Sequence, residues 1–247
     1  MPAWTYGMFV WRELATNDVE SALGFYGEVA GWKSKKIDMP NGPYHLLLAG
    51  ESQVGGVMKL ATGIDMPPYW MSYASVDDVD QTLQQAQHLG GQVVWGPIDV
   101  AGVGRMGTIV DPRGAAFSVM KSVDGDTFPG DPPEAGEFYW EELATPDVNG
   151  AKAFYGAVLG WKAFPLRGTE LEVFGFSEKR TEQAASLTPS PRAGWSTFVA
   201  VEALAPACDR ATRLGGKVLS EKIVVPGVGT SSVIQDPQGA VICLFKR

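Results

Sequence analysis

The side chains that most often perform chemistry in proteins are scarce in this chain of 247 residues. Its histidines are His45 and His88, and its cysteines are Cys208 and Cys243. His45 lies in a predicted strand without a second ligand at useful spacing, and His88 lies near the end of a predicted helix, so we expect structural roles for both. The sequence also lacks a nucleophile elbow, a catalytic triad pattern and a CxxC pair. Carboxylates are therefore the remaining candidates for acid–base chemistry.

The strongest pattern in the sequence is an internal repeat. Shifted by 129 residues, Trp11–Lys33 falls on Trp140–Lys162, with 15 of 23 positions identical. After a deletion of four residues, Asp111-Pro112 falls on Asp236-Pro237. A period of about half the chain predicts a duplicated domain rather than a solenoid. The predicted boundaries are 5–121 for the first domain, 122–136 for a linker rich in proline, glycine and acidic residues, and 137–247 for the second domain.

Each copy alternates between strand and helix patterns. In the first copy, Phe9–Ala15 is a predicted strand, and apolar residues spaced three and four apart predict a helix that Gly31 ends. We expect Thr16 or Asn17 to cap this helix, and Thr145 to cap its equivalent. The further elements predicted in this copy are strands at 44–49, 55–60 and 70–76, a helix at 78–89, and strands at 107–110 and 115–121. The predicted order is β-α-β-β-β, twice per domain.

A glycine-rich segment, Gly102–Arg105 (GVGR), is superficially similar to a phosphate-binding loop. It lacks the strand-to-helix context and the full spacing of such loops, so we predict a turn into the next strand. Thr230 replaces Arg105 in the second copy, so an anion held by this arginine would bind to the first copy alone.

The pattern ELATxDVxxAxxFYGxVxGWK, followed by VDDVD, LGG, GVGR and DPxGA, resembles the vicinal oxygen chelate superfamily. That group includes glyoxalase I, extradiol dioxygenases and bleomycin-resistance proteins, and the chain is most similar to two-domain bacterial members described as glyoxalase-like or as hydroxylases. The resemblance implies an α+β fold of tandem duplicated glyoxalase-like domains, in each of which two βαβββ modules form an incomplete barrel. One scaffold hosts many activities, so the resemblance does not specify the reaction.

Enzymes of this family bind a divalent metal through His or Glu at fixed positions on the inner face of the barrel. The resemblance maps these positions to Trp11, Met71 and Ser118 in the first domain and to Trp140, Ser196 and Cys243 in the second. Indole has no free lone pair for a metal, a thioether suits hard cations poorly, and hydroxyls bind weakly. We therefore expect no metal site and no cofactor.

Strand alternation extends the predicted inner face from these positions. It adds one acidic residue to each domain, Glu13 and Glu142. The ligand-binding residues predicted in this way are Trp11, Met71, Tyr73, Ser118 and Met120 in the first domain and Trp140, Ser196, Phe198, Cys243 and Phe245 in the second. A mostly apolar concave surface with few polar groups is typical of a small-molecule pocket.

The two acidic residues admit two interpretations of equal weight. In apolar surroundings a lone carboxylate is desolvated and can serve as a general acid or base, which makes Glu13 and Glu142 candidate catalytic residues. Alternatively, each carboxylate accepts hydrogen bonds from the backbone or from a tyrosine hydroxyl and only shapes the barrel.

The aromatic residues divide into a predicted pocket and a predicted core. Trp11 and Trp140 lie at inner-face positions of the resemblance, and we favour pocket lining over barrel filling for both. We expect core packing for Trp70 and Trp195, one residue away from that register. The residues on the apolar face of the first helix of each copy and just beyond its end are also expected in the core: Phe25, Tyr26, Phe154, Tyr155, Trp32 and Trp161.

The composition argues against several classes of partner. The chain has 20 basic and 28 acidic side chains, a net charge of −8 and no Lys/Arg stripe, so nucleic acid is not an expected partner. No apolar run is long enough to span a membrane and the first residues lack signal-peptide features, so we expect a cytoplasmic location. The two cysteines are expected to be free thiols. A monomer and a homodimer fit the sequence equally.

Three functions remain open on the sequence. The first is a binding protein, in the manner of the bleomycin-resistance branch, that holds a small aromatic or amphipathic compound without converting it. The second is a metal-independent enzyme in which Glu13 or Glu142 moves a proton on a carbonyl or hydroxylated aromatic substrate. The third is a metal-dependent lyase or dioxygenase, which the superfamily implies and the residues at the ligand positions oppose.

Overall fold

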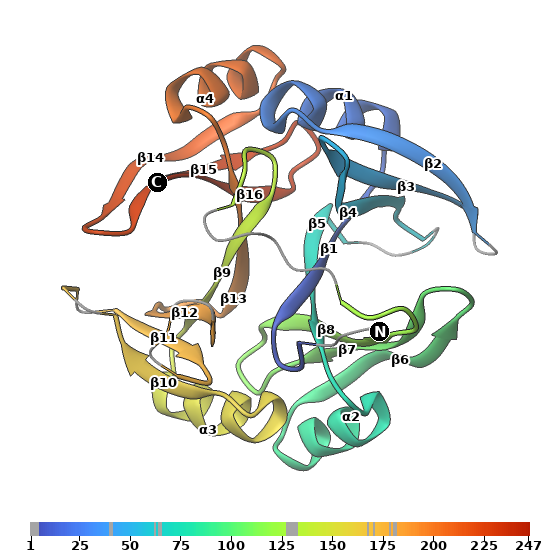
Figure 1. Cartoon of the computed structure of the whole chain (residues 1–247), viewed down its shortest axis with the longest axis vertical. Helices are drawn as coiled ribbons and strands as arrows, with labels where there is room; N and C mark the ends of the chain where they lie inside the picture. The colour runs from blue at the N-terminus through green and yellow to red at the C-terminus, as the bar shows by residue number, and fades with distance from the viewer. Residues whose placement is uncertain are drawn as a thin grey trace. The chain divides into compact units, whose positions relative to one another are not determined.

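The computed structural model describes residues 5–39, 42–61, 63, 66–126, 133–166, 168–169, 171–177, 179 and 182–247, so residues 127–132 of the predicted linker lie outside the described part. The repeat forms two successive series of elements (Figure 1). The first comprises β1 (Phe9–Thr16), α1 (Val19–Ala30), β2 (Lys33–Met39), β3 (Gly42–Ala49), β4 (Ser52–Lys59), β5 (Tyr69–Ser75), α2 (Val79–His88), β6 (Gln92–Val100), β7 (Gly104–Val110) and β8 (Ala116–Ser122). The second comprises β9 (Phe138–Thr145), α3 (Val148–Leu159), β10 (Lys162–Pro165), β11 (Glu172–Gly175), β12 (Gln183–Pro189), β13 (Gly194–Ala200), α4 (Leu204–Arg213), β14 (Lys217–Val225), β15 (Gly229–Gln235) and β16 (Val241–Lys246).

Both series have the predicted β-α-β-β-β order twice over, and each forms one eight-stranded sheet. The strand order is β2-β3-β4-β1-β5-β8-β7-β6 in the first sheet and β10-β11-β12-β9-β13-β16-β15-β14 in the second. The first and last strands of a module pair in parallel, as β1 does with β4. The second, third and fourth strands pair in succession as antiparallel hairpins, as β2, β3 and β4 do. The predicted α+β fold of duplicated βαβββ modules is confirmed. Within the described ranges, no helix is long and apolar enough to cross a membrane.

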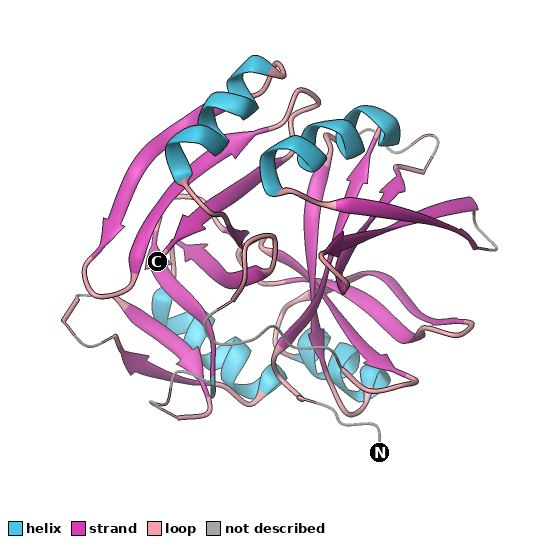
Figure 2. Cartoon of the chain, turned by 45° about the horizontal axis from the view of Figure 1, so that its top comes forward, coloured by secondary structure: helices cyan, strands magenta, loops and turns pink. Residues whose placement is uncertain are grey.

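The chain forms two compact units, and each unit combines one module from either half. The α2–α3 unit contains residues 1–11, 72–128 and 140–196, and the α1–α4 unit contains residues 12–71, 129–139 and 197–247. In both views of the structure, the two helices of each unit lie side by side (Figures 1 and 2). The compact units therefore do not follow the sequence repeat, because a module of one half packs against a module of the other.

Each unit has its own hydrophobic core, to which both halves of the chain contribute. In the α1–α4 unit the indole N–H of Trp32 donates to the carbonyl oxygen of Gly136 at 2.6 Å. In the α2–α3 unit the indole N–H of Trp161 donates to the carbonyl oxygen of Gly7 at 2.7 Å. The predicted core residues are buried in these two clusters, which confirms the prediction for Phe25, Tyr26, Phe154, Tyr155, Trp32 and Trp161.

The repeated FYG and DPxG motifs meet in a chain of hydrogen bonds inside the α1–α4 unit. The indole N–H of Trp70 donates to the hydroxyl oxygen of Tyr26 at 3.1 Å, and that hydroxyl donates to Oδ2 of Asp236 at 3.1 Å. Oδ1 of Asp236 accepts from the backbone N–H groups of residues 238–240 at 2.8–3.0 Å. One buried carboxylate thus holds its own turn and the helix of the other half.

The α2–α3 unit contains the equivalent chain. The indole N–H of Trp195 donates to the hydroxyl oxygen of Tyr155 at 3.1 Å, and that hydroxyl donates to Oδ2 of Asp111 at 3.0 Å. Oδ1 of Asp111 accepts from the backbone N–H groups of Arg113 and Ala115 at 2.8 and 2.9 Å. Core packing predicted for Trp195 and for its counterpart in the other unit is confirmed, with the addition of a specific hydrogen bond.

Because of these two tyrosines, the stability of the folded chain is expected to decrease at alkaline pH. Burial, and then the negative charge of Asp236 and Asp111, raise the pKa of Tyr26 and Tyr155 well above the ordinary value. The folded chain therefore keeps both phenolic protons where the unfolded chain, with a pKa of about 10, releases them. This contribution to stability is complete below pH of about 10 and is lost as the pH rises beyond it.

We expect the free energy of unfolding to fall with increasing pH above about 10, and to fall less steeply in a double variant Tyr26→Phe, Tyr155→Phe. Denaturant titrations at a series of pH values measure both slopes. Because lysines and exposed tyrosines titrate in both proteins, the difference between the slopes reports the two buried phenols. Equal slopes would contradict the assignment.

The helix caps differ from the prediction. Asp18 caps α1 and Asp147 caps α3, and their carboxylates accept N–H hydrogen bonds from three residues ahead at 3.1 and 2.9 Å. The caps predicted at Thr16, Asn17 and Thr145 are therefore wrong, because both threonines are buried at the ends of β1 and β9. Several residues able to cap stand in succession, and the end of the strand decides which of them opens the helix.

Two strands, β2 and β6, are missing from the sequence prediction. Both lie at edges of the first sheet and are largely exposed. β2 (KSKKIDM) has no apolar alternation, and β6 has register shifts on either side of Trp95, close to Gly96 with its φ of 79°. Edge strands pair on one side and can be exposed on both faces, so hydrophobic periodicity does not reveal them.

Candidate functional site

The predicted site residues lie on strands in the middle of the two sheets. The register brings Tyr73 opposite Ser118 in the α2–α3 unit and Phe198 opposite Cys243 in the α1–α4 unit. The complete placement is Trp11 and Glu13 on β1, Met71 and Tyr73 on β5, Ser118 and Met120 on β8, Trp140 and Glu142 on β9, Ser196 and Phe198 on β13, and Cys243 and Phe245 on β16.

Exposure divides these residues into two groups. The buried group comprises Tyr73, Ser118, Met120, Cys243 and Phe245. The half-buried group comprises Trp11, Glu13, Met71, Trp140, Glu142, Ser196 and Phe198. Since a ligand contacts accessible atoms, the half-buried group is the part of the predicted site that a ligand can reach in this structure.

Glu142 is held by two hydroxyl groups of the neighbouring strand. β9 pairs in parallel with β12, and this register places Ser186 directly opposite Glu142. The hydroxyls of Ser186 and Thr188 both donate to Oε2 of Glu142, at 3.3 and 3.1 Å. Because the two donors are two residues apart on one strand, they lie on the same face as the carboxylate. The arrangement fixes the orientation of a half-buried acid beside the strand position of Trp140.

Glu13, at the equivalent position of β1, has different neighbours. Its register partner on β4 is Gly56, and Met58 stands where the other copy has a threonine. A Cβ atom on Gly56 would collide with the hydroxyl of Tyr44, so this phenol fills the space of the missing serine side chain. Burial, and then the negative charge of Glu13, raise the pKa of Tyr69, the first residue of β5. Glu13 therefore belongs to a face rich in phenols.

These neighbours of the two acids are absent from the sequence-based prediction. The sequence of β12 does predict part of this arrangement, because strand alternation in AASLTP places the side chains of Ser186 and Thr188 on one face. Their meeting with Glu142 depends on the pairing of two strands that are distant in sequence, which no local pattern encodes. Tyr44 and Tyr69 carry no comparable signal, because each lies at or near the start of a strand.

The family's metal positions hold poor donors for a cation. Ser118 is buried, and its hydroxyl shares a 2.8 Å hydrogen bond with the hydroxyl of Thr108. Cys243 is buried and is not part of a disulfide. His45 is buried opposite the core residue Val57, and His88 is exposed at the end of α2. Among the residues that the structure describes, no three His, Cys, Asp or Glu side chains come together in a way that could hold a metal ion.

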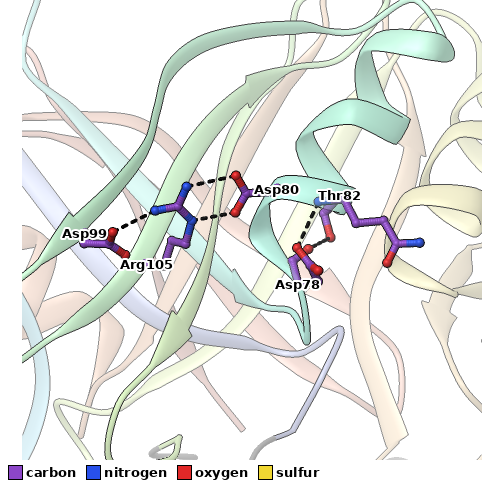
Figure 3. Close-up of polar contacts among 6 residues, drawn as sticks. Asp78, Asp80, Thr82, Asp99 and Arg105 are labelled. Atoms are coloured by element: carbon purple, nitrogen blue, oxygen red, sulfur yellow. Dashed lines mark hydrogen bonds and ion pairs between the residues drawn. The ribbon is translucent and has the colours of Figure 1, made fainter.

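Arg105, in the GVGR segment, is engaged by acidic side chains (Figure 3). Its guanidinium donates to both carboxylate oxygens of Asp80 at 2.5 and 2.8 Å and to Asp99 at 2.8 Å. The segment itself is a turn that leads into β7 at Gly104, as predicted. Two carboxylates thus occupy the donors that an anion would need, and the structure does not favour anion binding at this arginine.

A small hollow of about 190 Å³ lies in the α1–α4 unit beside the end of β16. Phe245, a predicted ligand-binding residue, forms part of its wall and stacks on Tyr139 with ring centroids 4.2 Å apart. Small-molecule sites usually measure about 300–1,000 Å³. The hollow is therefore too small to accommodate a ligand of several rings.

Comparison with known proteins agrees with this fold. Residues 8–119 match the family model of the glyoxalase/bleomycin resistance protein/dioxygenase superfamily, and residues 141–245 match that of the glyoxalase-like domain. The chain belongs to this superfamily, and the resemblance identified in the sequence is confirmed. It is 30% identical over 251 residues to "Putative glyoxylase CFP32" of Mycobacterium tuberculosis (strain CDC 1551 / Oshkosh), covering 96% of this chain and 93% of the relative. It is 30% identical over 254 residues to the anthracycline biosynthesis protein DnrV of Streptomyces peucetius, covering 95% and 91%.

Solved structures with the same fold include a Mn(II)-bound glyoxalase and a 2,3-dioxygenase. The Mn(II)-bound glyoxalase from Novosphingobium aromaticivorans aligns with a TM-score of 0.64 and 16% identity, covering 97% of this chain and 82% of that one. The 2,3-dioxygenase LapB from Pseudomonas sp. KL28 aligns with a TM-score of 0.64 and 14% identity, covering 98% and 92%. At these identities the likeness concerns the fold alone.

Proposed function

We propose that the chain binds a small aromatic or amphipathic molecule on the half-buried strand faces around Glu13 and Glu142, without a bound metal ion. The observation that carries this proposal is the carboxylate of Glu142, which two hydroxyls hold in place two residues from the half-buried Trp140. A few fixed polar groups beside an aromatic surface are what a small-molecule site requires.

Two further observations support the proposal. The family's metal positions carry side chains that are poor ligands for a divalent cation, such as Ser118, whose hydroxyl already shares a hydrogen bond with Thr108. The relative DnrV is named for anthracycline biosynthesis, and anthracyclines are flat polycyclic aromatic compounds. An aromatic ligand of this kind would match the indole surface of Trp140.

A metal-independent enzyme is the second candidate. Both hydroxyl hydrogen bonds go to Oε2 of Glu142, which leaves Oε1 for a proton of the bound compound. A carboxylate whose orientation is fixed in this way suits a general base. In this candidate Glu142, or Glu13 in the other copy, accepts a proton from a carbonyl compound or a hydroxylated aromatic substrate.

Doxorubicin, a fluorescent anthracycline, tests the binding proposal. We expect a saturable change in its fluorescence on titration with the protein, and affinity that is several-fold to about tenfold weaker in Trp140→Leu, because an aromatic pair contributes about 0.5–1.5 kcal/mol. Trp95→Leu, which removes an exposed indole of edge strand β6 outside the two proposed faces, is the control and should leave the affinity unchanged. A lack of saturable binding by doxorubicin and by every member of a panel of aromatic metabolites would contradict the proposal.

Chromatography of the bound compound separates the two candidates. A binding protein returns the compound unchanged, whereas an enzyme yields a product whose formation stops in Glu142→Gln or Glu13→Gln while binding persists. Elemental analysis of the purified protein tests the metal-free part of the proposal. A stoichiometric divalent ion would overturn that part.

A further inference from the structure

Glu142 carries a negative charge that is not balanced by a cation among the residues the structure describes. Other acids of the α2–α3 unit are paired, Glu172 with Lys152 at 2.6 Å and Asp147 with Arg113 at 2.5 Å. Hydroxyl groups orient a carboxylate without neutralising it. A half-buried carboxylate of this kind therefore attracts a positively charged group from outside the chain.

The hydrogen bonds of Glu142 determine which oxygen a ligand would meet. Ser186 and Thr188 both donate to Oε2, from the side of β12. Oε1 has no hydrogen-bond donor among the described residues. A ligand that binds here must therefore supply a donor, and a charged donor forms the stronger hydrogen bond with a carboxylate.

Trp140 provides the second contact. It stands two residues before Glu142 on β9, so the two side chains lie on the same face of the strand, about 7 Å apart along it. Trp140 is half-buried, so part of this residue is accessible to a ligand. A protonated amine a few bonds away from a flat ring system can reach the carboxylate while the ring, or the ammonium group itself, lies against the indole.

We propose that the Glu142 face selects aromatic ligands that carry a protonated amine. This inference rests on the proposed function, because it names the class of ligand for one of the two proposed faces. The recognition elements are Oε1 of Glu142 for the ammonium group, Trp140 for the ring system, and the hydroxyls of Ser186 and Thr188 as positioning groups that hold the carboxylate.

Matched ligands with and without the positive charge test the inference. Doxorubicin carries a primary amine, and N-acetyldoxorubicin has the same ring system without the charge; tryptamine and N-acetyltryptamine form a second pair. We expect the amine of each pair to bind about tenfold more tightly, since a hydrogen bond to a charged group is typically worth that factor. In Glu142→Gln the difference should disappear, while the N-acetylated ligands bind as they do to the unmodified chain.

Two variants keep the test decisive. Asp209→Asn removes an exposed carboxylate of α4, outside the two proposed faces, and should leave the preference for the amine intact. Ser186→Ala, Thr188→Val keeps the carboxylate but frees its orientation, and should reduce the preference without abolishing it. Equal affinities within each pair, or a preference that persists in Glu142→Gln, would overturn the inference, whereas saturable binding of any of these ligands leaves the proposed function intact. Failure of all four ligands to bind would overturn the inference, and the proposed function falls with it if the panel of aromatic metabolites does not bind either.

Discussion

Replacement of Asp236 by alanine is expected to lower the free energy of unfolding by about 3–4 kcal/mol, which is large for a single substitution. The carboxylate is buried and accepts hydrogen bonds from three backbone N–H groups of its turn and from Tyr26. Without the carboxylate, several buried donors lose their acceptor at once, and each unsatisfied donor costs about 1–3 kcal/mol. Water that enters the space of the side chain can accept some of these hydrogen bonds, so the total is smaller than the sum. Denaturant unfolding followed by tryptophan fluorescence measures the effect.

Conservative variants separate the roles of the two carboxylate oxygens. Asp236→Asn keeps one acceptor and should cost less than the alanine variant. Tyr26→Phe removes two hydrogen bonds, the one to Asp236 and the one from Trp70, and should cost about 1–3 kcal/mol. Asp209→Ala removes an exposed carboxylate from α4 of the same unit and should change stability by at most about 0.5 kcal/mol. A cost for Asp236→Ala as small as that of Asp209→Ala would show that the turn does not depend on this residue.

The second large effect is expected when the halves of the chain are separated. Each hydrophobic core draws on both halves: Leu83 and Phe117 from the first half pack with Phe154 and Trp161 from the second in the α2–α3 unit. A half on its own would expose the apolar surface of two modules, which is unfavourable at about 25 cal/mol per Å². We therefore expect neither residues 1–126 nor residues 127–247 to form a stable folded monomer, and we expect the two to assemble when produced together.

Size-exclusion chromatography and circular dichroism of each half, alone and in a mixture, test this expectation. The control is the full chain with a protease site inserted between residues 126 and 133, since cleavage there cuts the backbone and leaves both halves present. The cleaved protein should stay associated and unfold at a denaturant concentration close to that of the intact chain. A first half that is monomeric, folded and cooperative on its own would contradict the pairing of modules across the halves.

The features that the sequence predicted well are those that the repeat records twice. The repeat places two tyrosines, Tyr26 and Tyr155, and two aspartates, Asp111 and Asp236, at matching positions, because each pair performs the same packing role. A residue type that recurs in both copies therefore predicts its place in the core. The edge strands β2 and β6 were not predictable, because partial exposure removes the alternation on which strand recognition depends.

The candidate site was predictable only in part for a different reason. Alternation along a single strand suffices to group Trp140 with Glu142, and these positions remain a prediction about ligand binding. The hydroxyls that hold Glu142 come from β12, and their approach depends on strand register rather than on any spacing within the sequence. Local sequence also does not predict that a large side chain on one strand fills the space left by a small residue on the next. The Tyr44 phenol fills the space beside Gly56 in this way.

The exchange of modules between the halves constrains how this chain can change. A substitution in the turn at Asp236 is felt by the helix that carries Tyr26, more than two hundred residues away in sequence. Substitutions at these hydrogen-bonded positions in one half therefore affect the other half as well. The strand faces around the two glutamates already differ, with a glycine in one copy where the other has a serine. A duplicated protein built in this way can acquire two ligand specificities while the core contacts between its two halves are retained.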